Sequence, residues 1–182
     1  MSESSLGFEG FSGRIGRWSF QRRNGRTFIR RRPARSASTE AQIDVQRRFR
    51  LAASYAKAVA ADPMLRIPYE PVAASRKASL YQVAMTDYLR PPEVGSLVLE
   101  GFTGVMGNPV KVIAFDDVDV MSVTVAIRAE DDTLLEQGAA VRVGTEWVYT
   151  TTMAHPQGTP VSITATAADR PGNKGSKMVT WS

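Results

Sequence analysis

The chain has 182 residues, of which 43% are hydrophobic and 23% charged, proportions that are ordinary for a globular protein. It contains no cysteine, which excludes disulfides, thiolate catalysis and thiolate-bound metals, and it has no stretch of about 18 apolar residues that could cross a bilayer. The net charge of +5 is uneven, because residues 1–99 carry 17 basic and 8 acidic side chains whereas residues 100–182 carry 6 and 10.

The first predicted element is a basic β-hairpin. Between Arg14 and Arg35 the chain has nine arginines, no lysine and no acid. Residues 15–23 and 26–32 flank Asn24-Gly25, a dipeptide that readily supplies the two positive φ angles of a type I′ turn. A two-residue turn fixes the register, and alternation then predicts one mainly apolar and one mainly basic face. The basic face is expected to carry Arg17, Arg23, Arg26, Arg30 and Arg32.

Two helices are predicted next, over residues 40–61 and 76–89. Ser38 or Thr39 would cap the first, and Asp62-Pro63 would end it. The proline-containing segment 64–74 is expected to be an extended linker. Ser75 would cap the second helix, which Arg90 and two prolines would stop.

From Val94 onward the helical period gives way to alternating or short apolar runs separated by Gly, Pro, Asn and Asp. Seven strands are predicted, over residues 96–102, 110–115, 122–129, 139–143, 147–152, 161–167 and 177–181. This pattern indicates a β-sandwich. The predicted fold class is therefore α+β, with a basic hairpin and two helices in residues 1–91 and an antiparallel sandwich in residues 92–182.

Two segments resemble known families. Residues 7–60 resemble an uncharacterised bacterial family, known mainly from Bacteroidota, in a Gly-rich hairpin followed by a Thr-Glu-x-Gln helix. The matching residues are Gly13, Gly16, Asn24-Gly25, Arg30, Pro33, Thr39-Glu40-x-Gln42, Arg47 and Phe49. That resemblance supports the architecture and implies no activity.

Residues 163–173, which read Ile-Thr-Ala-Thr-Ala-Ala-Asp-Arg-Pro-Gly-Asn, are followed by a last strand. This run is similar to the immunoglobulin-like modules of bacterial surface proteins and virion proteins. The resemblance implies an immunoglobulin-like topology for the sandwich, and such modules serve as spacers, adhesive units or particle decoration.

The sequence offers little for catalysis. The sole imidazole is His155, in a turn before proline, and we interpret it as a solvated turn residue because no nucleophile, phosphate-loop or zinc motif accompanies it. We therefore predict no catalytic residues, no cofactor and no enzymatic activity.

Two acidic clusters are weak candidates for calcium, since hard oxygen ligands from adjacent loops are what that ion requires. A shared site would require the two clusters to converge at one end of the sandwich. The alternative is that Asp residues here make strand-end turns, and neither cluster has the order of an EF-hand loop. The candidate residues are Asp116, Asp117 and Asp119 in one cluster, with Glu130, Asp131 and Asp132 in the other.

The arginines leave three interpretations open. The basic face could dock against acidic loops of a neighbouring subunit, such as those around Asp116 and Asp131; it could bind nucleic acid or another polyanion; or it could be a solvated surface. We predict a structural subunit of a phage-like or injection-type particle, or of another bacterial assembly, with other protein subunits as partners. Nucleic-acid binding is the alternative. No signal peptide is evident, so we expect synthesis in the cytoplasm, no membrane insertion, and a virion or extracellular particle as a second location.

Overall fold

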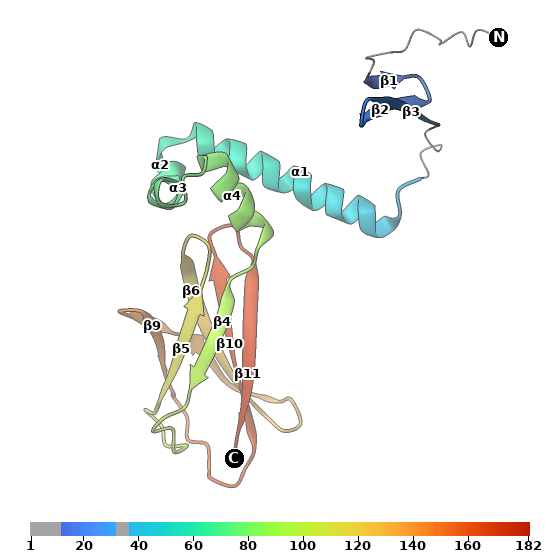
Figure 1. Ribbon diagram of the computed structural model, residues 1–182. Coiled ribbons are helices and arrows are strands. Elements are labelled where there is room, and N and C mark those ends of the chain that lie inside the picture. The colour runs from blue at the N-terminus through green and yellow to red at the C-terminus, as the bar shows by residue number, and fades with distance from the viewer. Residues whose placement is uncertain (1–11, 32–36) are drawn as a thin grey trace, which may run out of the picture. The chain divides into compact units, whose positions relative to one another are not determined.

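The computed structural model describes residues 12–31 and 37–182. They belong to two compact units, Met1–Ile43 and Asp44–Ser182, which are treated separately below. The division that the sequence predicts between residues 91 and 92 falls inside the second unit. In outline the fold is α+β, with an N-terminal three-stranded sheet, then helices, then two antiparallel four-stranded sheets (Figure 1).

The first unit contains a three-stranded antiparallel sheet in the order β1-β2-β3, formed by Gly13–Ile15, Trp18–Arg23 and Arg26–Arg31. Asn24 and Gly25 have φ angles of 49° and 74°, and Phe20 pairs with Ile29, so the predicted turn and register are confirmed. The single strand predicted over residues 15–23 is wrong. Gly16, with φ of 54°, opens a second two-residue turn, because glycine readily adopts the positive φ that such turns need.

Helix α1, Glu40–Ala61, has the predicted bounds. A capping box begins it: the Gln42 N–H donates to Oγ1 of Thr39, and the Thr39 N–H donates to Oε1 of Gln42. Residues 40–51 are all exposed, whereas Ala52, Ala56 and Val59 are buried. Val45 and Phe49 extend that buried stripe toward the N-terminus at alternating spacings of four and three residues, yet both are exposed.

The predicted linker over residues 64–74 is wrong, since it contains helices α2, Pro63–Arg66, and α3, Glu70–Arg76. Their prolines lie at the first or second helical position, where no intrahelical N–H bond is lost. The second predicted helix begins later than expected: α4 is Leu80–Leu89 and is capped by Ser79, because Lys77 adopts a left-handed conformation that ends α3. No helix in residues 37–182 is long and apolar enough to cross a membrane.

Eight strands follow, grouped in two sheets of order β4-β5-β9-β8 and β11-β10-β6-β7. Five predicted strands are confirmed to within a few residues, and the first begins and ends earlier than expected. The predicted strand 139–143 is divided at Ala140, where the chain passes from one sheet to the other. The strands are β4 Glu93–Val98, β5 Pro109–Phe115, β6 Val120–Ala129, β7 Leu134–Ala139, β8 Val141–Val143, β9 Glu146–Thr150, β10 Val161–Asp169 and β11 Lys174–Trp181.

Both sheets contribute to one hydrophobic core. Val110, Val112 and Trp147 come from the first sheet, and alternate residues of β6 and β10 come from the second. Strand β10 alternates buried and half-buried positions along its whole length. Such alternation is what a sheet with one covered face requires.

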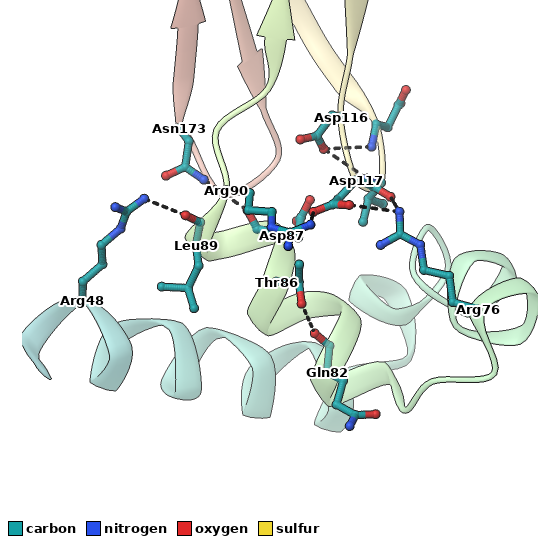
Figure 2. Close-up of polar contacts among 12 residues, drawn as sticks. Arg48, Arg76, Gln82, Thr86, Asp87, Leu89, Arg90, Asp116, Asp117 and Asn173 are labelled. Carbon is teal, nitrogen blue, oxygen red and sulfur yellow. Dashed lines mark hydrogen bonds and ion pairs between the residues drawn. The ribbon is translucent and has the colours of Figure 1, made fainter. Parts of the chain in front are cut away.

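The helices attach to one end of these sheets through polar contacts (Figure 2). Nδ2 of Asn173, in the β10–β11 turn, donates to the backbone oxygens of Asp87 and Tyr88 in α4. Asp117, in the β5–β6 loop, forms ion pairs with Arg76 at 3.0 Å and with Arg90 at 3.5 Å. We call this region the junction.

Candidate functional site

Four arginines of the three-stranded sheet share one face. Directly paired residues of antiparallel strands project to the same side, and Ser19 pairs with both Arg14 and Arg30. The next two pairs on the same face are Gln21 with Phe28 and Arg23 with Arg26, because every second residue of a strand projects to the same side. We call this surface the arginine face and define it by Arg14, Arg23, Arg26, Arg30 and Phe28.

Three of the five predicted arginines, Arg23, Arg26 and Arg30, lie on the arginine face. Arg17 does not continue strand β2 as expected, because it occupies the turn that Gly16 opens between β1 and β2. Arg32 lies outside the described residues. Sequence reasoning missed Arg14, whose position depends on strand β1; the signal was glycine at the first position of a possible turn, just after Ile15.

The arginine face is electrostatically unfavourable by itself. All four guanidinium groups are on exposed residues, and no carboxylate in the described part of the chain pairs with them. Arg23 and Arg26 are direct cross-strand neighbours, and like charges in that position destabilise a sheet. An anionic partner would remove this repulsion.

The opposite face of the same sheet is mainly apolar, although it also carries Arg22 and Arg31, and it is incompletely covered. Ile15, Trp18 and Ile29 are 47–52% exposed, although Phe20 is buried. A sheet of three strands, none longer than six residues, has too little surface to bury a core of its own. Both faces of the sheet therefore present groups that a partner could cover.

The two acidic clusters do not converge, so the arrangement that a shared calcium site would require is not present. Strand β6 lies between them, and its ten residues at about 3.3 Å each place the loops roughly 30 Å apart. In the first cluster, Oδ2 of Asp116 accepts bonds from the N–H groups of Val118 and Asp119. Asp117 belongs to the junction, and Asp119 pairs with Arg142 at 2.9 Å.

The second cluster is a turn. Asp131 accepts a hydrogen bond from the Thr133 N–H, which lowers the pKa of its carboxyl, and Asp132 pairs with Arg128 at 3.7 Å. Within residues 12–31 and 37–182, no group of three or more His, Asp or Glu side chains is arranged to hold a metal ion. The observed contacts of both clusters are those of strand-end turns and ion pairs.

His155 is not a solvated turn residue, and that interpretation is wrong. It is 3% exposed, and its Nε2 lies 2.7 Å from Oε1 of the buried Glu136 in β7. Oε2 of Glu136 accepts bonds from Tyr149 Oη and from the N–H and Oγ1 of Thr152. Burial would raise the pKa of Glu136, but these hydrogen bonds outweigh it and lower the pKa. The cluster fastens the β9–β10 loop to strand β7.

We expect Glu136→Gln to destabilise the protein by about 1–3 kcal/mol, because an amide can accept fewer of these bonds and places a donor where one carboxylate oxygen accepted. Chemical denaturation at neutral pH measures the change. Glu130→Gln, at an exposed carboxylate one loop away, is the matched control and should change stability by less than about 0.5 kcal/mol. Equal effects for the two variants would contradict a fastening role for Glu136.

Comparisons with known proteins add little. A scan against models of protein families finds no match, and neither does a search of curated proteins. Among solved structures, the chain is similar to an engineered protein of known crystal structure, with 25% sequence identity and a TM-score of 0.31. The match covers 42% of this chain and 16% of that one, so the chain spans less than a fifth of that protein's length. A similarity of this size carries no argument about fold or function.

Proposed function

We propose that the protein is a non-enzymatic structural subunit of a phage-like or injection-type particle, or of another bacterial assembly, and that it docks through the arginine face. The observation that carries this proposal is the state of the hairpin sheet. Its arginines lack carboxylate partners among the described residues, and apolar side chains on its other face are half exposed. A partner that supplies carboxylates would satisfy the arginine face.

We further infer an immunoglobulin-like sandwich. In that fold the strands, lettered in chain order, form an A-B-E-D sheet and a G-F-C sheet that can add C′. With β4 as strand A, the order β4-β5-β9-β8 corresponds to A-B-E-D, and β11-β10-β6-β7 corresponds to G-F-C-C′. The shared core supports the same inference. In an assembly such a module would act as a spacer or a displayed unit.

A second candidate function is binding of nucleic acid or another polyanion, and the same arginine face favours it. Guanidinium groups pair well with phosphates, and the described strands of the sheet carry no acid to repel them. If four arginines contact phosphates, the logarithm of the binding constant should fall with the logarithm of salt concentration with a slope of about −3 to −4.

The test is a matched pair of charge reversals. Arg26→Glu with Arg30→Glu changes the arginine face, whereas Arg22→Glu with Arg31→Glu changes the same number of arginines on the opposite face. Sedimentation velocity of protein from the native source, followed at 260 and 280 nm, reports the assembly and any bound nucleic acid. We expect the first pair to abolish the large species and the second pair to leave most of it.

Two results would decide against assembly. Normal incorporation of the Arg26→Glu, Arg30→Glu variant would contradict docking through the arginine face. A small species with excess 260 nm absorbance that is lost at high salt would favour polyanion binding instead.

A further inference from the structure

Three loops of the second unit lie at the end of the sheets that is remote from the helices (Figure 1). The β4–β5 loop, residues 99–108, touches the β9–β10 loop, residues 151–160: the His155 N–H donates to the Gly104 oxygen, and the Gly107 N–H donates to the Thr151 oxygen. The β6–β7 loop, residues 130–133, follows Ala129, which pairs with the first residue of β10. We call the surface of these loops the distal end.

The distal end is acidic. Its three loops contain no lysine or arginine, and their four carboxylates, from Glu100, Glu130, Asp131 and Asp132, are on exposed residues. Arg128 on the adjacent strand pairs only with Asp132 among the described residues, at 3.7 Å. Near the junction, Asp117 pairs with Arg76 and Arg90, and Asp119 pairs with Arg142.

The distal end also exposes apolar side chains. Val105, Met106 and Met153 are 59%, 65% and 49% exposed. On the arginine face, Phe28 is 51% exposed and lies between Arg26 and Arg30 along its strand. Methionine sulfur packs favourably against aromatic rings, so the two surfaces match in apolar character as well as in charge.

We propose that the arginine face of one copy binds the distal end of a second copy. This proposal rests on the proposed assembly function and names the partner as another molecule of the same chain. Four guanidinium groups would face four carboxylates, with Phe28 against the exposed methionines. The two surfaces differ and every copy carries both, so the contact is heterologous: it builds an open filament, or a ring if the rotation between copies closes.

The experiment uses sedimentation velocity of the full-length purified protein, freed of nucleic acid, over a range of protein and salt concentrations. We expect concentration-dependent oligomers at 50 mM salt that dissociate at 500 mM, because salt screens exposed charges. Either Arg26→Glu with Arg30→Glu, or Glu100→Arg with Glu130→Arg, should give monomers. Combining all four substitutions in one chain should restore oligomers, since the charges are then exchanged across the same contact.

The control reverses two exposed acids outside the distal end, Glu70→Arg and Glu93→Arg, and should leave the oligomers unchanged. Thermal unfolding of each variant checks that it folds. A wild-type protein that stays monomeric at every concentration, or a fourfold variant that stays monomeric although folded, overturns the proposal. If the wild type is monomeric while arginine reversal still blocks incorporation into the native particle, the partner is another protein and the proposed function stands. If arginine reversal alters neither measurement, both proposals fail.

Discussion

Folding stability of the Asp44–Ser182 unit is expected to fall as pH rises from about 4 to about 7. The group responsible is Asp87, which is fully buried at the junction. Burial, together with the negative charge of nearby Asp116, raises the pKa of Asp87 from 3.8 to about 7, against the lowering effect of the hydrogen bond from the Tyr69 hydroxyl.

The direction follows from proton counting. The unfolded chain releases this proton near pH 3.8, whereas the folded unit keeps it until about pH 7, so the folded state binds more protons throughout that interval. Stability therefore decreases across the interval and levels off above it. The full effect is on the order of 4 kcal/mol. Burial also raises the pKa of Asp169, which likewise makes stability fall as pH rises. The pKa of Glu136 is lowered instead, so its contribution to stability is lost as pH falls below about 4.5.

The geometry explains why Asp87 keeps its proton. Its Oδ2 accepts a 2.7 Å bond from Tyr69, whose hydroxyl lies 2.6 Å from that of Tyr55. Oδ1 of Asp87 and Oδ1 of Asp116 are buried without a hydrogen-bond donor in the described part of the chain. A proton on Oδ1 of Asp87, donated toward Asp116, would satisfy both oxygens.

Asp87→Asn tests this account. An amide can accept from Tyr69 and donate to Asp116 at every pH, so the variant should be more stable than the wild type at pH 8 and should lose most of the decrease in stability between pH 5 and 8. Denaturant unfolding at a series of pH values measures both effects. Asp44→Asn, at an exposed site on α1, should retain the wild-type slope. A wild-type stability that rises between pH 5 and 7 would contradict the raised pKa.

The second large effect is expected for Gly104→Ala. Gly104 has φ of 79°, and a Cβ there would lie 1.9 Å from the His155 oxygen and 2.6 Å from the Trp181 ring. The backbone on both sides is tied, because the His155 N–H donates to the Gly104 oxygen at 2.6 Å. We expect a loss of about 3 kcal/mol or more, which lowers Tm by on the order of 10 °C.

Gly107→Ala is the matched control for that prediction. Gly107 lies in the same loop with φ of 90°, but its added Cβ would meet nothing within 4 Å. It should therefore show the backbone strain alone, about 1 kcal/mol, and the difference between the variants measures the clash. Equal Tm values for the two variants would mean that the β9–β10 loop moves away from Gly104 at little cost.

The parts of the fold that the sequence predicted well are those with local causes. Asn24-Gly25 sets the hairpin register through its own φ preferences, and a capping residue together with Asp62-Pro63 sets both ends of α1. Strands β5, β6 and β10 bury alternate apolar residues, so their period was visible. The prolines in residues 64–74 led to the prediction of an extended linker where helices α2 and α3 lie, because proline is found in the first turn of helices as well as at helix breaks.

The candidate site was only partly predictable, because its remaining features depend on distant residues. Strand β1 has three residues and no apolar alternation, so the glycine that follows Ile15 was the one signal that Arg14 joins the arginine face. Strand β7 buries Glu136 where the pattern calls for an apolar residue. That carboxylate is stabilised by Tyr149, Thr152 and His155, which lie 13 to 19 residues away in the chain.

The exposed first half of helix α1 is expected to fold after its buried second half. The first twelve residues of the helix are all exposed, so little tertiary packing offsets the entropy of ordering them, although Arg48 donates a hydrogen bond to the Leu89 oxygen. An isolated helical segment of that length is marginal in water, and here the buried second half of the helix serves as its nucleus. A partner that covered Val45 and Phe49 would supply the missing packing. Binding and the final folding of α1 would then be one cooperative event.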